Sequence, residues 1–339
     1  MTTDPTSPRA RTLQDIARLA GVHSGTVSRA LANNPLVNAE TRARIQALAA
    51  EHGFRPNQMA SRLRTQKTNV VGVVVPLGHE KRQHLSDPFF MTIMGHLADQ
   101  LTEGGYDIML SRVIPDADDW LERIVDSGML DGVLLIGQSD QFAAIERVAA
   151  RYRQLVVWGS MVEGQRHCAV GVDNRLGGLL AGRRLIARGC CRIAFFGETR
   201  TLELVHRYQG LQDACGEAGI APPLACATHL ASDVMTAEIT AHLDRLGDGI
   251  DGIAAASDVI AMRIVRVLAD RGIAVPDGMP VIGFDDLPLA NHIVPRLTTI
   301  RQDVAYGASA MIRALFDRMD GREAPSVVMP PVLIARDSA

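Results

Sequence analysis

The chain has 339 residues, of which 47% are hydrophobic and 22% charged, with a formal net charge of −3. That much apolar sequence exceeds what one small core needs and predicts two or more domains. Because no run of about 18 uncharged apolar residues occurs and the N-terminal stretch is polar, we expect no membrane span, no signal peptide and a cytoplasmic protein. The five cysteines form no C-x-x-C pair, which favours reduced thiols over disulfides or zinc.

The charge is divided unevenly along the chain. Residues 1–68 hold nine Arg and one Lys against two Asp and two Glu, a net charge of +6 that leaves −9 for the remainder. A basic head on an acidic body predicts phosphate contacts confined to one end of the molecule. The alternative, a solvated charged tail, is disfavoured because the arginines interleave with a helical pattern.

The first structured segment is residues 12–37. Apolar residues recur there at helical spacing on either side of Gly21, and they are Leu13, Ile16, Ala17 and Ala20, then Val22, Val27, Ala30 and Leu31. Two short helices joined by a tight turn are typical of a helix-turn-helix. The second helix is left with Ser24, Gly25, Ser28 and Arg29 facing outward, available to a DNA major groove.

A third helix completes this headpiece. Asn38 is a suitable N-cap for a helix over residues 39–52, and Gly53 ends it. Residues 54–57 form an extended joint, and residues 58–64 are long enough for about two helical turns. We therefore expect a headpiece over residues 1–56, a hinge helix and linker over residues 57–68, and a core over residues 69–339.

The core alternates apolar runs with amphipathic helical patterns. The runs lie at residues 70–76, 106–110, 132–137 and 155–159, then at 192–197, 252–257 and 279–285, with a last one near 327–334. This rhythm predicts parallel strands with crossover helices. Because it restarts once, we expect two doubly wound lobes that face one cleft, with ligand groups at the carboxyl ends of the strands.

Five motifs carry a resemblance to a known family. They are T-L-Q-D-I-A-R-L-A-G-V (12–22), T-V-S-R-A-L (26–31), G-F-R-P-N-Q-M-A-S-R-L (53–63), V-I-G-F-D-D (281–286) and P-R-L-T-T-I-R-Q-D (295–303). In this order and spacing they make the chain resemble the lactose-repressor (LacI/GalR) family of bacterial transcription regulators over essentially its whole length.

The resemblance implies an all-α helix-turn-helix headpiece and an α/β core like that of periplasmic binding proteins, crossed three times by the chain. One lobe would hold residues 69–160 and 292–325, and the other residues 161–291 and 326–337. Because no leucine-heptad tail follows, we expect a homodimer that reads a pseudo-palindromic operator in double-stranded DNA.

The resemblance also implies DNA contacts in the headpiece and hinge. The matching positions are Thr12, Leu13, Ser24, Gly25, Thr26, Ser28, Arg29, Asn38, Asn57, Ala60 and Leu63. The Arg29 guanidinium suits guanine or phosphate because it donates two parallel hydrogen bonds. Leu63 matches a leucine that wedges between central base pairs, with packing on its own domain as the alternative. His23 stands where the family usually has a serine.

For the cleft, the resemblance implies an effector site. The matching positions are Asp87, Phe89, Phe90, Trp158, Arg207, Asp258, Asp285 and Gln302. Aromatic rings suit the apolar face of a pyranose, and the Asp285 carboxylate can accept from two adjacent sugar hydroxyls. Two alternatives stay open: Phe90 as a core residue, and Trp158 as a residue buried in the hinge.

These features predict a repressor of a carbohydrate-utilisation operon that is released by a small sugar or glycoside. A corepressor-dependent regulator that senses a nucleoside or a phosphorylated sugar is the alternative. We expect no enzyme, no catalytic residues, no metal and no cofactor, because G-x-S-x-G, P-loop and strand-linked G-x-G-x-x-G motifs are missing from the sequence. The basic headpiece argues against a plain sugar-binding protein.

Overall fold

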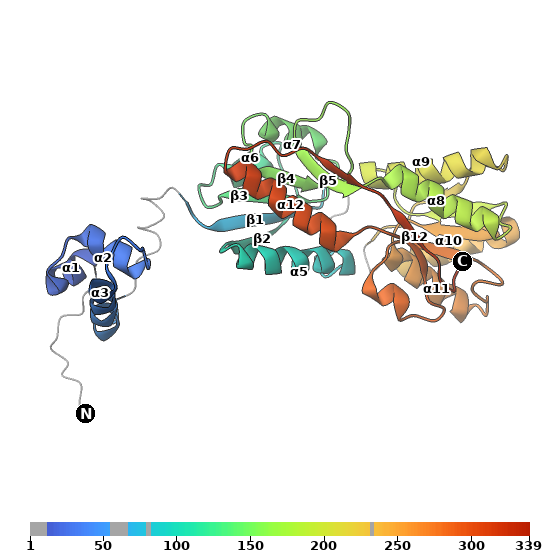
Figure 1. The fold of residues 1–339 in the computed structure, drawn as a ribbon. Helices are drawn as coiled ribbons and strands as arrows, with labels where there is room; N and C mark the ends of the chain where they lie inside the picture. Colours follow the sequence, from blue (N-terminus) through green and yellow to red (C-terminus); the bar gives the residue numbers. More distant parts are fainter. Residues whose placement is uncertain (1–11, 55–66, 79–82, 231–233) are drawn as a thin grey trace. The chain divides into compact units, whose positions relative to one another are not determined.

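The structure is a computed structural model that describes residues 12–54, 67–78, 83–230 and 234–339 (Figure 1). It divides into two compact units, Met1–Thr68 and Asn69–Ala339. Three residues predicted to contact DNA from the hinge, Asn57, Ala60 and Leu63, lie outside the described residues.

The first unit contains three helices, α1 (Leu13–Ala20), α2 (Ser24–Leu31) and α3 (Ala39–Glu51). Thr12 and Asp15 cap α1 reciprocally, because the Thr12 side chain accepts from the Asp15 NH (3.1 Å) and the Asp15 carboxylate accepts from the Thr12 NH (3.0 Å). Gly21 ends α1 at φ 65°, a left-handed conformation that favours glycine. The predicted turn is thus produced by local chemistry.

The other two helices also begin at side-chain caps. His23, in place of the usual serine, caps α2 with its Nδ1, which accepts from the Gly25 NH at 3.2 Å. Asn38 caps α3 by accepting from the Thr41 NH at 2.7 Å, as its sequence position predicts.

A small apolar core holds the three helices together. Its buried members are Ile16, Ala17, Ala20, Val27, Ala30, Val37, Ile45, Ala49 and Phe54. The α3 side chains of Arg44 and Gln46 donate to the carbonyls of Ala20 (3.0 Å) and Ala30 (3.3 Å), so α3 also satisfies carbonyls at the ends of α1 and α2.

The second unit contains two six-stranded sheets, one in each lobe, which confirms the predicted fold class (Figure 1). The lobe 1 sheet has the order β11-β5-β4-β3-β1-β2 and is parallel throughout. Its strands are β1 (Val70–Pro76), β2 (Asp107–Val113), β3 (Gly132–Ile136), β4 (Leu155–Trp158), β5 (Cys168–Val172) and β11 (Val327–Met329).

The lobe 2 sheet has the order β12-β10-β9-β8-β6-β7, and only the β10–β12 pair is antiparallel. Its strands are β6 (Ile193–Phe196), β7 (Leu224–Cys226), β8 (Gly252–Ala255), β9 (Val281–Asp285), β10 (Thr298–Arg301) and β12 (Val332–Ile334).

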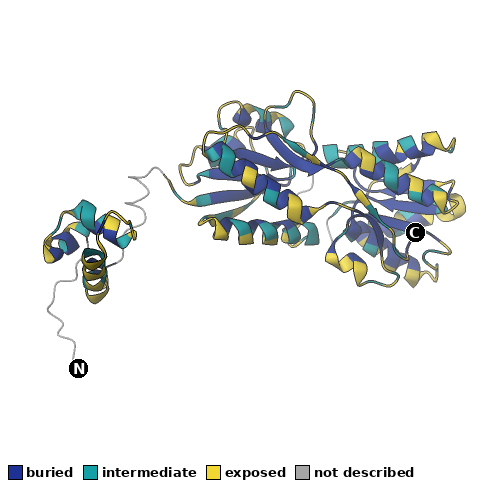
Figure 2. Cartoon of the chain, viewed as in Figure 1, coloured by how far each residue is buried: buried dark blue, intermediate teal, exposed yellow. Residues whose placement is uncertain are grey.

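Helices cover the sheets of both lobes. Those of lobe 1 are α5 (Pro88–Glu103), α6 (Trp120–Val125), α7 (Phe142–Ala149) and α12 (Val304–Met319). Those of lobe 2 are α8 (Asn174–Ala187), α9 (Leu202–Glu217), α10 (Met235–Leu246) and α11 (Asp258–Asp270), with short 3₁₀ turns at Gly247–Gly249 and Pro288–Asn291. Figure 2 shows buried strands beneath helices whose outer faces are exposed. Within the described ranges, no helix is both long and apolar enough to cross a bilayer.

The lobe boundaries differ from those expected. Strand β5, expected in lobe 2, pairs with β4 in lobe 1, and β10, expected in lobe 1, pairs with β9 in lobe 2. The single closing strand expected near residues 327–334 is two strands, β11 and β12, which lie in different sheets. Pro330 and Pro331 separate them, because proline has no NH to donate to a ladder. The chain therefore crosses between lobes after β5, β10 and β11.

Helices α8 and α9 pack closely because glycines lie between them. A Cβ on Gly210 of α9 would lie 1.8 Å from the carbonyl oxygen of Arg175, and a Cβ on Gly178 of α8 would lie 2.0 Å from that of Arg207. Only glycine allows the two backbones to approach this closely. This packing sets the position of Arg207, which α9 carries toward the space between the lobes.

Replacing Gly210 with alanine therefore tests the helix pair. We expect Gly210→Ala to lower the free energy of unfolding by about 1–3 kcal/mol or more, since the added methyl group overlaps backbone atoms. Gly216→Ala on the same helix is the matched control, because a Cβ there meets nothing within 4 Å. We expect it to raise stability by up to about 1 kcal/mol through helix propensity. Urea denaturation measures both, and equal effects would contradict the packing argument.

Candidate functional site

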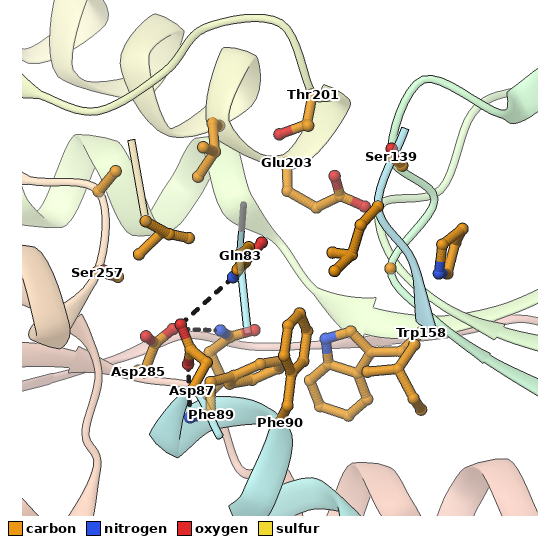
Figure 3. A pocket seen from close by; sticks show the side chains of 18 of the residues that line it. Gln83, Asp87, Phe89, Phe90, Ser139, Trp158, Thr201, Glu203, Ser257 and Asp285 are labelled. Atoms are coloured by element: carbon orange, nitrogen blue, oxygen red, sulfur yellow. Dashed lines mark hydrogen bonds between the residues drawn. The ribbon is translucent and has the colours of Figure 1, made fainter. Parts of the chain in front are cut away.

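A cavity of about 130 Å³ lies between the two lobes (Figure 3). It is lined at the carboxyl ends of four strands, by Pro76 of β1, Ile136 of β3, Trp158 of β4 and Asp285 of β9. Such a volume accommodates a small molecule, since about 10–15 Å³ suffices for one water. The carboxyl edge of parallel sheets is the usual place for a ligand in this architecture.

One wall of the cavity is aromatic. Phe89 and Phe90, in the first turn of α5, line it together with Trp158. The ring centroids of Phe89 and Phe90 are 6.0 Å apart, and those of Phe89 and Trp158 are 5.9 Å apart. Both phenylalanines are half-buried and also pack against the lobe 1 core. The core packing left open for Phe90 is therefore observed, and its contact with an effector stays a prediction. The wall offers an apolar face to a flat ligand.

Asp87 begins α5 beside this wall. Its Oδ1 accepts from the Phe89 NH at 2.9 Å, and its Oδ2 accepts from the Gln83 amide at 3.3 Å. Burial raises the pKa of the Asp87 carboxyl, while these hydrogen bonds act in the opposite direction. The helix cap therefore holds a carboxyl group at the cavity.

Arg207 enters the cavity from lobe 2 and is held on several sides. Its Nε donates to Asn174 Oδ1 at 2.8 Å, its Nη1 donates to the Ala256 carbonyl at 2.5 Å, and its guanidinium lies 3.7 Å from the centroid of the Phe284 ring. Burial lowers the pKa of Arg207, and the nearby carboxyl groups of Asp285 and Glu203 oppose that shift. A guanidinium has five NH donors, so donors beyond these two bonds are available to a ligand.

Asp285 lies next to Arg207, with 3.8 Å between its Oδ1 and the Arg207 Nη1. The Gln302 amide donates to the same Oδ1 at 2.6 Å. Burial raises the pKa of Asp285 to about 7, against the lowering effects of Arg207 and Gln302. The backbone of Asp285 has φ 123°, a strained value for a residue other than glycine. Strain of this kind is common where a structure holds a functional side chain in place.

Asp258 does not line the cavity, although the sequence predicts that it contacts the effector. It is fully buried behind the wall, where its carboxylate accepts from the Thr299 hydroxyl at 2.5 Å and from the Leu287 NH at 2.8 Å. The preceding Ser257 lines the cavity instead and caps α11. The cavity therefore receives Ser257 and not Asp258. Asp258 is the first residue of α11, and its side chain points toward Thr299 of the sheet.

Several lining residues were not predicted from the sequence. Among them are Ser139, Thr201, Glu203, Leu204 and Leu230. Glu203 lies four residues before Arg207 on α9, a spacing that places both on one face of a helix, so helical periodicity from Arg207 would have found it. In the view of Figure 3, Thr201 and Glu203 lie on the side of the cavity opposite Asp87 and Asp285.

In the headpiece, the predicted DNA contacts fall into two groups. Thr12 and Asn38 are helix caps, and Leu13 is half-buried against the core. The others lie on α2: Ser24, Gly25, Thr26 and Ser28 are partly exposed and Arg29 is exposed. The helix thus presents one short polar face that ends in a cation.

A helix-turn-helix unit and a two-lobed α/β unit with an interlobe cavity together define a ligand-responsive DNA-binding protein. Residues 12–57 match the family model of bacterial regulatory proteins of the lacI family, and residues 183–339 match the model of a periplasmic binding protein-like domain. The chain is 31% identical to the HTH-type transcriptional regulator CelR of Thermobifida fusca, with 97% of this chain and 98% of that protein covered. It belongs to the LacI family of bacterial transcriptional regulators.

Solved structures give the same result. A complex of the transcriptional regulator CelR with cellobiose is 28% identical with a TM-score of 0.69, covering 97% of this chain and 100% of that one. The lac repressor dimer bound to operator and the anti-inducer ONPF has a TM-score of 0.83 at 22% identity, covering 96% and 98% of the two chains. This second likeness is one of fold.

The raised pKa of Asp285 predicts a pH-dependent stability. Because the folded state holds this proton more tightly than the unfolded state, the contribution of Asp285 to stability is fully present below its ordinary pKa of 3.8 and is lost as pH rises through about 7. In the parent protein, we expect the free energy of unfolding to fall between about pH 5 and pH 8. In Asp285→Asn this fall should be smaller by roughly 1–3 kcal/mol. Urea denaturation across this range measures the slope. Asp248→Asn, at an exposed turn, is the control, and an unchanged slope in Asp285→Asn would contradict the assignment.

Proposed function

We propose that the chain is a cytoplasmic transcriptional repressor of a carbohydrate-utilisation operon. It binds a pseudo-palindromic operator as a homodimer and is released by a small sugar or glycoside in the interlobe cavity. The observation that carries the proposal is the cavity itself, which is lined both by an aromatic wall and by the buried pair of Arg207 and Asp285. Ligand binding rather than catalysis is the proposed role of these groups.

The polar groups of the cavity suit a ligand rich in hydroxyl groups. Carboxyl groups at Asp87, Asp285 and Glu203 accept hydrogen bonds, and Arg207 donates them, so a sugar hydroxyl has both kinds of partner. The aromatic wall takes the apolar face of a pyranose ring. The similarity to the CelR regulator, whose solved complex contains cellobiose, supports a sugar of this kind.

A phosphorylated sugar, one of the alternatives from the sequence, fits this arrangement less well. Arg207 already donates to Asn174 and to the Ala256 carbonyl, and it lies near Asp285. The described lining residues include three carboxyl groups and one cation, Arg207. A dianionic ligand is disfavoured there because the acidic groups outnumber the basic one.

The two units would work through linkage between their sites. A ligand that alters the relation of the lobes changes how the dimer presents its headpieces, at a coupling of about 1–3 kcal/mol. The coupling is reciprocal. Operator DNA must therefore lower the affinity of the protein for an inducer by the same factor by which the inducer lowers its affinity for the operator. In a corepressor-dependent regulator, a ligand in the same cavity would raise the affinity for the operator instead of lowering it.

For DNA binding, we expect Arg29→Ala to weaken binding to an operator selected from a random duplex library by about 1–3 kcal/mol, the usual value of one good base contact. Fluorescence anisotropy of the labelled duplex measures the affinity. The control is Arg266→Ala, which removes an equal charge from the exposed surface of α11 in the core. If both variants lose the same affinity, the loss reflects net charge and Arg29 makes no specific contact.

The effector can be identified by a thermal-shift screen of cellobiose, ribose, glucose 6-phosphate and adenosine. We expect a neutral sugar among these compounds to stabilise the protein. At 100 times the dissociation constant the gain is about 2.7 kcal/mol. The gain should disappear in Arg207→Ala and Asp285→Ala and persist in Arg183→Ala, whose side chain is exposed on α8. Stabilisation by glucose 6-phosphate alone would contradict the neutral-sugar proposal. An affinity unchanged by saturating operator would contradict linkage.

A further inference from the structure

Glu203 is the point at which α9 of lobe 2 reaches the backbone of lobe 1. Its Oε1 accepts from the Ser160 NH at 3.3 Å, and the backbone of Gln138 also favours the charged form of its carboxyl group and so lowers its pKa. Ser160 lies two residues after β4, and Gln138 lies two residues after β3. Two loops at the carboxyl edge of the lobe 1 sheet thus converge on one carboxyl group from the opposite lobe.

A glycine provides the space for this contact. A Cβ on Gly159 would lie 2.8 Å from Glu203 Oε1 and 2.7 Å from Gln138 Cγ, so any side chain there would displace the carboxyl group. The lobe 1 backbone is therefore shaped to receive Glu203. The space that Gly159 leaves for the carboxyl group is an observation independent of the hydrogen bond to Ser160.

The contact is also connected to the proposed ligand groups. The Ser160 hydroxyl accepts from the Asn174 amide at 2.9 Å, and Asn174 Oδ1 accepts from Arg207 Nε at 2.8 Å. Arg207 in turn lies beside Asp285. A continuous chain of polar contacts thus joins Asp285 to the loop of lobe 1 that receives Glu203.

The carboxyl group of Glu203 is buried, so its hydrogen bonds matter to its stability. Burial raises the pKa of its carboxyl group, and the backbone of Glu203 itself, the Ser160 NH, the charge of Arg207 and the backbone of Gln138 oppose that shift. A carboxyl group taken out of water needs hydrogen-bond donors, and the Ser160 NH of lobe 1 is one of them. Separating the lobes would replace this donor with water, so the contact is made only while the lobes stay together.

We propose that Glu203 is a positioning residue that ties lobe 2 to lobe 1 and holds the cavity closed before an effector arrives. The role goes beyond ligand binding, because it concerns the lobe relation in the free protein. It does not require the effector to be a sugar. A ligand that disturbs Arg207 or Asp285 reaches this tie through Asn174 and Ser160.

Quenching of Trp158 fluorescence by acrylamide tests the proposal in the full-length, ligand-free chain. Trp158 is 5% exposed, lines the cavity and lies two residues before Ser160. The chain has two tryptophans, so a Trp120→Phe background leaves Trp158 as the sole fluorophore. We expect Glu203→Ala to lower the ratio of closed to open lobes about tenfold through loss of the hydrogen bond to the Ser160 NH, and so to raise the quenching constant.

Two matched variants separate a tie between lobes from a general loss of structure. Glu203→Gln keeps an acceptor oxygen and should restore quenching close to that of the parent protein. Glu217→Ala removes a carboxylate from the other end of α9, where it pairs with Arg183, and should leave quenching unchanged. Urea denaturation verifies that each variant is folded.

Quenching of Glu203→Ala equal to that of the parent protein would overturn the proposal. So would an equal rise in Glu203→Ala and Glu217→Ala. Should Glu203→Ala not fold, Gly159→Ala serves in its place, because its methyl group presses on the same carboxyl group from the lobe 1 side. Unchanged quenching in that variant would likewise overturn the proposal, whereas failure to find a sugar ligand would leave it standing.

Discussion

The buried guanidinium of Arg207 is the interaction on which the cleft depends. A charge taken out of water is costly unless its surroundings supply hydrogen bonds and an opposite charge. Asn174 at the start of α8, the Ala256 carbonyl after β8, and Phe284 and Asp285 of β9 supply them. Because these four partners come from three different segments, the requirement to satisfy one cation places three segments of lobe 2 around a common point.

The close packing of α8 and α9 follows from the same requirement. Gly178 and Gly210 let the helix backbones approach, and this approach brings Arg207 within reach of Asn174. A larger residue at either position would move the guanidinium away from its partners. Glycines far from the cavity wall are therefore as necessary to the site as the residues that line it, although they never touch a ligand.

How much could be predicted depended on how local the deciding interactions are. The capping residues Thr12 and Asn38 lie where the sequence places helix starts, and Gly21 ends α1 where it predicts the turn. Phe89, Arg207 and Asp285 were named from the family resemblance and lie on the cavity wall. Motifs find residues at positions that a family shares.

Glu203 shows what such motifs leave out. Its contact with lobe 1 depends on the Ser160 NH, 43 positions earlier in the chain, and on the space that Gly159 leaves. Asp258 shows the converse, because its motif position suggested a ligand contact and the start of α11 turned it toward Thr299. In both cases the deciding partners lie on other elements, which no local pattern describes.

By itself, the sequence determined the helices of the headpiece, the alternation of apolar strands with helices, and the basic character of one end. These features depend on side chains within a few positions of one another. Only the tertiary structure decided which sheet receives β5, β10 and β11, which carboxyl groups share the cavity, and how Glu203 meets lobe 1. Strand pairing and the burial of charge depend on partners far apart in the chain, so their outcome emerges only when both lobes are folded.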